Sequence, residues 1–152
     1  MRKLANEELN RLEIDDFKKA DKNPLIIILD NVRSLHNIGA VFRTADAFLV
    51  KKIYLCGITA RPPHKEIRKT ALGATQSVDW EYLENTIDIV KTLSGHHREI
   101  IAIEQAENAI SLKDYRPQQE KETVFIFGNE VKGVDQPVVD LCDSVIEIPQ
   151  FG

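Results

Sequence analysis

The chain has little of the chemistry that marks secreted, membrane-spanning or metal-binding proteins. Its 152 residues include only two cysteines, Cys56 and Cys142, which lie too far apart to form a metal-binding or redox motif. No apolar run approaches the ~20 residues that a membrane span requires, and the charged N-terminus, MRKLANEELNRL, has no apolar core of a secretory signal. We therefore expect buried free thiols and a soluble, cytoplasmic protein that does not act at a membrane.

Common catalytic and nucleotide-binding signatures are missing as well. Neither glycine-rich phosphate loop, GxxxxGK(S/T) or GxGxxG, occurs, and there is no HExxH. His96 and His97 are adjacent, so they do not converge on one helical face, and no cysteine or carboxylate ligands accompany them at a zinc-binding spacing. We therefore expect no metal site and no cysteine-based catalysis.

The chain also has fewer basic than acidic residues. Twenty Lys and Arg stand against 24 Asp and Glu, which gives a formal net charge of -4. This balance counts against binding nucleic acid by bulk charge, although a local basic patch could still bind it. The length and the hydrophobic fraction of 43% fit one globular domain with a sizeable core.

Short apolar runs recur along the chain and alternate with helical patterns. The expected strands are 25–29, 52–56, 77–82, 99–103, 123–127 and 144–148, and the expected helices are 38–48, 85–97 and 137–142. Most of these runs lack polar alternation, which suits strands covered on both faces, whereas 77–82 alternates and favours an edge strand. The alternation predicts a single three-layer α/β domain with a mostly parallel sheet.

The first helical patterns lie at either side of the first strand. Residues 2–22 carry a rough apolar stripe that predicts a helix packed across the sheet or a partner subunit, or alternatively a basic surface that touches a polyanion. That stripe comprises Leu4, Leu9, Leu12 and Phe17. Asn37 is the expected N-cap of the helix 38–48. The expected inward face of this helix comprises Ile38, Val41, Phe42, Ala45 and Phe48.

Polar residues and glycines follow several of the expected strands. Asn37 and Arg43 come after the first strand, and Gly128, Asn129 and Glu130 come directly after 123–127. Because the carboxyl ends of parallel strands open onto one edge, these residues are expected to meet there. Individually each is more often a helix cap, a surface ion pair or a turn. Together they indicate a small-molecule site built from loops and backbone amides.

Three stretches in this order resemble the motifs of the SpoU-like RNA methyltransferases, which belong to the SPOUT, or α/β trefoil-knot, superfamily. They are NIGAVFRTAD at 37–46, IFGNEVKG at 126–133 and IEIP at 146–149, and KTALGA at 69–74 is also similar. The resemblance covers roughly residues 24–152. It implies a knotted methyltransferase domain over 24–152, preceded by an N-terminal helix over 1–23.

The resemblance also implies a cofactor and a reaction. Members of the family bind S-adenosylmethionine in a bent form, transfer its methyl group to a ribose 2′-hydroxyl of tRNA or rRNA, and work as homodimers. Arg43 would be the catalytic residue, and Asn37 and Glu130 would shape the site and hold Arg43 and the RNA. An arginine stays protonated, so we expect Arg43 to orient a phosphate and stabilise oxyanion character rather than act as a base.

The remaining site residues are cofactor contacts, which the same motifs imply, and RNA contacts, which are chosen by their basic side chains. The expected cofactor contacts are Phe127, Gly128, Asn129, Gly133, Ile148 and Pro149. The expected RNA contacts are basic residues of loops that could face RNA, and the alternative is that they are ordinary solvated charges: Arg33, Arg61, His64, Lys65, Arg68 and Lys69. In the family the third motif continues into a Ser-Leu-Asn segment and a final helix that complete the knot. We therefore expect that the chain as given lacks this C-terminal part and that its knot is incomplete.

Two other functions remain open at this point. One is a noncatalytic RNA-binding module that keeps the fold for dimerisation. The other is a knotted methyltransferase that modifies a base instead of a ribose.

Overall fold

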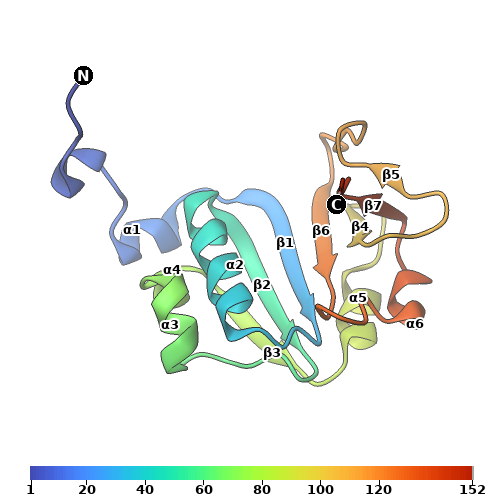
Figure 1. Ribbon diagram of the computed structural model, residues 1–152. Helices are drawn as coiled ribbons and strands as arrows, with labels where there is room; N and C mark the ends of the chain where they lie inside the picture. The colour runs from blue at the N-terminus through green and yellow to red at the C-terminus, as the bar shows by residue number, and fades with distance from the viewer. Residues whose placement is uncertain (152) are drawn as a thin grey trace.

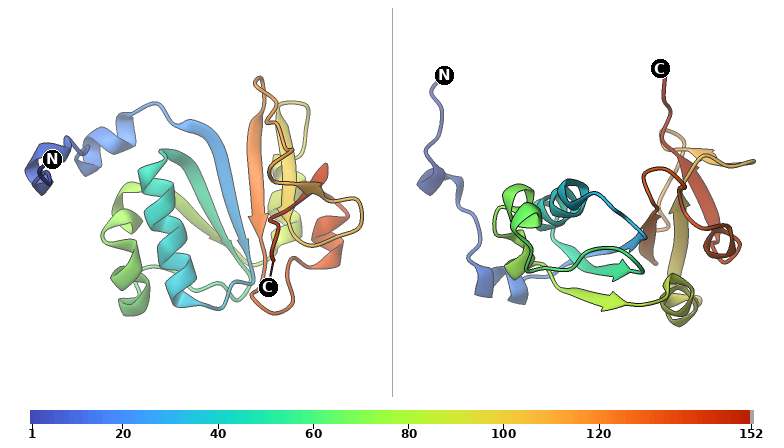
Figure 2. Two further views of the ribbon diagram at one scale, coloured as in Figure 1. Left: turned by 45° about the horizontal axis from the view of Figure 1, so that its top comes forward. Right: turned by 60° about the horizontal axis from the view of Figure 1, so that its bottom comes forward.

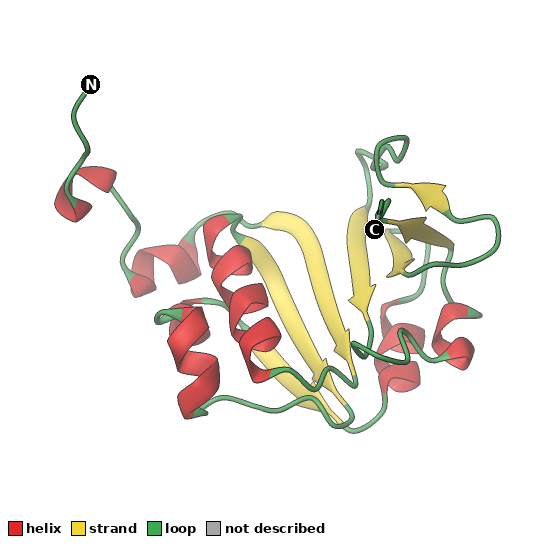
Figure 3. Cartoon of the chain, viewed as in Figure 1, coloured by secondary structure: helices red, strands yellow, loops and turns green. Residues whose placement is uncertain are grey.

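The computed structural model describes residues 1–151 and shows one α/β domain built on a seven-stranded sheet (Figures 1 and 3). The strands lie in the order β3-β2-β1-β6-β4-β7-β5, and every pair is parallel. Their bounds are β1 Asn23–Asp30, β2 Val50–Cys56, β3 Trp80–Leu83, β4 Arg98–Ile103, β5 Ile110–Ser111, β6 Glu122–Phe127 and β7 Ser144–Glu147. The predicted α/β domain with a mostly parallel sheet is confirmed.

The central strand β1 is the most apolar stretch of the chain. Ile28 pairs with Tyr54 of β2 on one side and Ile126 of β6 on the other. Ile28 and Ile126 are fully buried. A β-branched run without polar alternation fits such a position, because helices cover both faces of a parallel sheet.

Helices cover the two faces of the sheet and complete three layers (Figure 1). One face packs against α2 Leu35–Ala47, α3 Lys65–Ala71 and α4 Ala74–Ser77. The opposite face packs against α5 Thr86–Leu93 and α6 Gln136–Val139. Among the core side chains, Phe42 of α2 and Val90 of α5 are each fully buried, on opposite faces.

Helix α2 begins earlier than the sequence predicts. Its N-cap is Ser34, whose Oγ accepts a hydrogen bond from the Asn37 backbone amide at 3.2 Å. The expectation that Asn37 caps the helix is therefore wrong, and Asn37 lies in the first turn with its side chain free for another contact. Phe48, expected on the inward face, is 63% exposed because it lies beyond the last helical residue.

The single helix expected over residues 2–22 is also wrong. The structure has a 3₁₀ turn, η1 Asn6–Leu9, and a short helix, α1 Ile14–Lys19. Asn10 adopts a left-handed conformation with φ 45°, which interrupts a helix at that point. The segment before α1 extends away from the rest of the domain (Figure 2). Among the residues of its apolar stripe, Phe17 alone is buried.

Other boundaries shift by a few residues. Helix α5 ends at Leu93 instead of continuing to residue 97, and β3 begins at Trp80 instead of residue 77. Ser77 belongs to α4, a short helix that the sequence does not predict. The basic stretch from Lys65 forms α3, and the two-residue strand β5 lies at the edge next to β7.

Candidate active site

The candidate site lies where the chain leaves two neighbouring strands in opposite directions. Strand β1 leads into α2 on one face of the sheet, and its neighbour β6 leads towards α6 on the other. Such a divergence opens a crevice at the carboxyl edge of a parallel sheet, which is where ligands bind in open α/β folds. The loop 31–34 after β1 and the loop 128–135 after β6 form the sides of this crevice.

Glu130 joins the two loops. Its carboxylate accepts hydrogen bonds from the backbone amides of Arg33 at 3.0 Å and Ser34 at 2.9 Å, and from Asn37 Nδ2 at 3.1 Å. Partial burial alone would raise the pKa of the Glu130 carboxyl, but these donors together hold its pKa below the usual value. The structure therefore brings Asn37 and Glu130 together, as the sequence predicts.

The loop after β6 folds tightly on itself. The backbone N–H and C=O groups of Asn129 and Gly133 pair at 3.0 and 2.8 Å, and Asn129 Nδ2 donates to the Asn31 carbonyl at 2.8 Å. A Cβ on Gly128 would lie 2.1 Å from the Gly133 carbonyl carbon, closer than real Cβ contacts come. Glycine at 128 is therefore required by the close approach of backbone to backbone.

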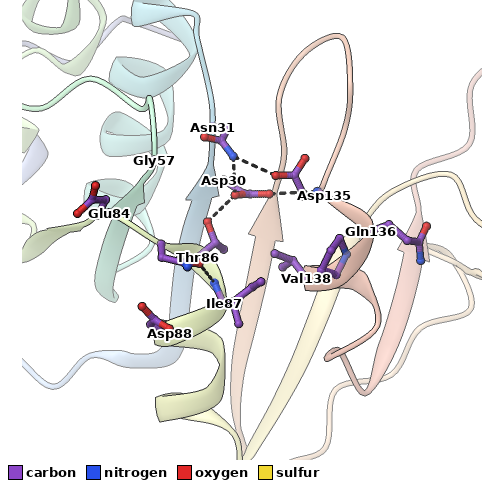
Figure 4. Close-up of a pocket in the computed structure, with 12 residues that line it drawn as sticks. Asp30, Asn31, Gly57, Glu84, Thr86, Ile87, Asp88, Asp135, Gln136 and Val138 are labelled. Atoms are coloured by element: carbon purple, nitrogen blue, oxygen red, sulfur yellow. Dashed lines mark hydrogen bonds between the residues drawn. The ribbon is translucent and has the colours of Figure 1, made fainter.

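A cavity of about 630 Å³ lies on the α5 and α6 side of the same edge (Figure 4). Buried Asp30, the last residue of β1, accepts hydrogen bonds from Asn31 Nδ2 at 3.1 Å and from the Asp135 backbone amide at 3.2 Å. The side chains of Glu84, Asp88 and Asp135 add three more carboxylates to the lining. Four carboxylates repel polyanions, so this side of the edge does not suit an RNA backbone.

A smaller cavity of about 380 Å³ lies against the loop after β6. Its lining comprises Ile103, Glu104, Gln105, Phe127, Gly128, Asn129, Glu130, Val131, Gly133, Ile148 and Gln150. Glu104 follows β4 and accepts hydrogen bonds from the backbone amides of Gln105 at 2.8 Å and Val134 at 2.9 Å. Five of the six predicted cofactor contacts lie in this lining, whereas Pro149 is adjacent in sequence but does not line it.

Arg43 lies apart from Asn37 and Glu130. It follows Asn37 by six positions in the helix, which places it about 9 Å farther along α2 and turns it about 120° away. Its Nη1 lies 3.6 Å from Asp46 Oδ2, and it lines a cavity next to the N-terminal segment. The expectation that all three residues meet at one edge is therefore met for Asn37 and Glu130 but not for Arg43.

The predicted RNA contacts fall into two groups. Arg33 lines a cavity at the crevice, while Arg61 lies in the loop before α3. Lys65, Arg68 and Lys69 belong to α3, and all three side chains are exposed. His64 is the N-cap of α3, where its Nδ1 accepts a hydrogen bond from the Glu66 amide at 3.2 Å.

Several residues of the edge were not predicted from the sequence. Asp30 and Glu104 each sit at the carboxyl end of a buried apolar strand, which is the same signal that points to Glu130. Ser34 caps α2, and its backbone amide donates a hydrogen bond to Glu130. The second contact depends on the path of the loop, so no residue pattern predicts it.

The thiols and histidines do not extend the site. Burial raises the pKa of both Cys56 and Cys142 to about 11, so these groups stay protonated at neutral pH. Within residues 1–151, no three His, Cys, Asp or Glu side chains gather as metal ligands would, and none of the helices is long and apolar enough to cross a membrane.

Comparison with known proteins identifies the family. The sequence model of the SpoU rRNA Methylase family matches residues 24–152. A tRNA (guanosine(18)-2′-O)-methyltransferase of Aquifex aeolicus is 32% identical, over 98% of this chain and 68% of that protein. A 23S rRNA (guanosine-2′-O-)-methyltransferase of Haemophilus ducreyi is 27% identical, over 98% of this chain, which spans only 60% of that relative's length.

Solved structures show the same fold. The TrmH/SpoU tRNA modifying enzyme of Aquifex aeolicus matches with a TM-score of 0.75 and 27% identity, over 90% of this chain and 67% of that one. An rRNA methyltransferase from Sinorhizobium meliloti, solved with AdoMet bound, matches with a TM-score of 0.77 and 22% identity, over 90% of this chain and 52% of that one. Because the family model matches residues 24–152, the chain belongs to the SpoU rRNA methylase family.

Proposed function

We propose that this protein transfers a methyl group from S-adenosylmethionine to a ribose 2′-hydroxyl of tRNA or rRNA. The observation that carries the proposal is the contact of Glu130 with Asn37, because it joins two family motifs directly beside a ligand-sized cavity. The relatives named above methylate guanosine 2′-hydroxyls of tRNA and 23S rRNA.

The cavity of about 380 Å³ falls within the size range of small-ligand pockets, and its lining combines apolar side chains with polar groups. Ile103, Phe127 and Ile148 offer apolar surface for the adenosine, and the Glu104 carboxylate offers a counter-charge for the positively charged donor. Gly128 keeps the loop compact enough to form the cavity wall. When bound, this cofactor supplies an electrophilic methyl group on a sulfonium, so the protein's task is to position the hydroxyl in line with it.

Arg43 would orient the RNA. Its ion pair with Asp46 is long, at 3.6 Å, and the Arg43 side chain is 39% exposed. A pair of this kind contributes about 0–1 kcal/mol at most, so the guanidinium can exchange Asp46 for a phosphate at little cost. A guanidinium donates two parallel hydrogen bonds to a phosphate and stabilises a developing oxyanion.

The RNA would approach from the side of α2 and α3. Arg33, Arg61, Lys65, Arg68 and Lys69 lie there, whereas the α5 and α6 side of the edge carries the four carboxylates of the larger cavity. We also propose that the protein is a cytoplasmic homodimer with the family's trefoil knot. In this dimer, Arg43 of one subunit acts at the cofactor cavity of the partner, because within one chain Arg43 lies apart from that cavity.

The proposal is tested by Arg43→Ala, with Arg116→Ala as the matched control. Arg116 is an exposed arginine beyond β5 that donates only to nearby backbone carbonyls. We expect Arg43→Ala to lower the rate of methyl transfer to RNA by about 10²–10³-fold, the usual effect of removing one transition-state donor. Calorimetry should show S-adenosylmethionine affinity unchanged in both variants. Full activity of Arg43→Ala would contradict the assignment.

A further inference from the structure

A separate cavity of about 530 Å³ lies between the loop after β2, helices α3 and α4, and the edge strand β3. Pro62, Pro63 and Trp80 supply its apolar walls, and Arg68 and Gln76 supply charge and hydrogen-bonding groups. Its volume lies within the range of small-ligand pockets, which combine apolar walls with a few convergent polar groups. None of these residues lines the cavity beside Gly128.

The aromatic wall is held rigidly. The Trp80 ring meets Phe42 of α2 edge to face, with centroids 6.5 Å apart and planes at 86°, and Phe42 is fully buried. Trp80 remains partly exposed on its other side, where it lines the cavity. Tyr82 lies two residues later on the same face of β3. The Arg61 guanidinium carbon lies over the Tyr82 ring, 4.4 Å from the ring centre. Flat aromatic and guanidinium surfaces therefore lie side by side.

The charge around this cavity differs from that of the whole chain. Residues 61–73 carry four Lys or Arg and one Asp or Glu, although the full chain has 20 against 24. Lys65, Arg68 and Lys69 occupy one face of α3, opposite buried Ile67 and Ala71. Lys69 pairs with Glu66 at 2.8 Å, whereas Arg68 forms no ion pair within residues 1–151.

Helix α3 connects this cavity to the crevice. Thr70 Oγ1 donates to the His36 carbonyl in the first turn of α2 at 3.1 Å, and His36 Nε2 lies 3.6 Å from Glu66. The same turn of α2 contains Asn37, the partner of Glu130. Helix α3 therefore contacts α2 beside the crevice and also lines this cavity, and it carries the exposed cations Lys65, Arg68 and Lys69.

We propose that the cavity walled by Trp80 and Arg68 takes an unstacked base of a single-stranded segment of the substrate RNA. Proteins read single-stranded RNA by stacking splayed bases on aromatic rings and guanidinium planes, while basic side chains hold the backbone. Here Trp80 supplies the stacking wall, Gln76 can hydrogen-bond a base edge, and the α3 cations hold phosphates. This inference rests on the proposed function only in taking RNA as the ligand.

Trp80 is the only tryptophan of the chain, so it reports directly on the cavity. We would titrate the full chain, without methyl donor, with a single-stranded oligoadenylate and with an RNA duplex of equal length, and follow tryptophan fluorescence. Binding is followed independently by the anisotropy of labelled RNA. We expect the single strand to quench Trp80 by about half or more at saturation and the duplex to quench it much less, because paired bases cannot enter the cavity.

Substitutions then assign the effect. Arg68→Ala should weaken the fluorescence-detected affinity by about tenfold, equivalent to about 1.4 kcal/mol. Lys91→Ala, an exposed lysine of α5 on the opposite face, should leave it unchanged. Unchanged Trp80 fluorescence while anisotropy reports saturation, or the absence of RNA binding, would overturn the inference. Quenching without any methyl transfer would instead contradict the proposed function and leave this inference intact.

Discussion

Glu130 illustrates how one carboxylate can hold two loops of the crevice. It accepts hydrogen bonds from two backbone amides and from Asn37, and none of these donors has another carboxylate partner within residues 1–151. Hydrogen bonds to a charged acceptor are stronger than those to a neutral one. The ionised form of Glu130 should therefore stabilise the folded loops, and that contribution must depend on pH.

Glu130→Gln tests this dependence. The pKa of Glu130 is lower in the folded state than the unfolded value of about 4.3. Its stabilising contribution is therefore fully present above that unfolded pKa and is lost as pH falls through the folded pKa. We expect Glu130→Gln to be less stable than the parent at pH 7, and the difference to disappear at lower pH, by urea denaturation. Glu107→Gln, at an exposed glutamate, is the control. A difference that persisted unchanged in acid would refute the role of the charge.

The sequence predicts that Asn37 and Glu130 lie at the same edge, because each follows a strand and the carboxyl ends of parallel strands open onto one edge. It cannot choose between Ser34 and Asn37 as the cap of α2, because both residue types cap helices and the choice depends on how the preceding loop runs. The predicted position of Arg43 beside Asn37 and Glu130 was wrong, because two residues of one motif can lie on different sides of a helix.

At the scale of elements, the loop after β6 depends on Gly128. An alanine there would bring Cβ to 2.1 Å from the Gly133 carbonyl carbon and 2.2 Å from the Val134 nitrogen. We expect Gly128→Ala to cost about 1–3 kcal/mol of stability, as overpacking does, and to abolish S-adenosylmethionine binding measured by calorimetry. Lys91→Ala is the control, since Lys91 is an exposed residue of α5 that does not line the cavity beside Gly128. Equal cofactor affinity in the two variants would contradict the loop's role.

Two apolar residues of the N-terminal segment should differ in how much they stabilise the fold. Phe17 is 5% exposed and packs against the core on the α2 face, whereas Leu12 is 52% exposed. Phe17→Ala should lower the free energy of unfolding by about 3–5 kcal/mol, and Leu12→Ala by less than about 0.5 kcal/mol. Denaturant titration of both variants checks this. Similar losses would mean that residues before α1 pack on the domain.

Most long elements could be predicted because their apolar period is clear over many residues. The N-terminal helix failed because Leu4, Leu9, Leu12 and Phe17 are spaced by five, three and five residues, which gives no continuous helical stripe. Strand β5 was missed because two residues are too short to show any period. Such a strand forms only because β7 offers it a partner.

For the whole molecule, the sheet order explains why distant stretches form one site. Strands β1 and β6 are about 100 residues apart in sequence, as their pairing of Ile28 with Ile126 shows, yet they are neighbours in the sheet. Alternating strands and helices predict the α/β class but not this order, which depends on the connections between the two faces. The cavity beside Gly128 and the acidic cavity lined by the start of α5 lie at the edge that this order creates, and they could not be predicted.

We propose above that this domain methylates a ribose hydroxyl of RNA. The most direct measurement incubates the protein with tRNA or rRNA and methyl-labelled S-adenosylmethionine, digests the RNA with alkali and separates the products. A 2′-O-methyl group blocks cleavage of the adjacent phosphodiester, so we predict label in alkali-resistant dinucleotides. Label in mononucleotides would show base methylation, and RNA that binds without acquiring label would show a noncatalytic module; either result would contradict the account.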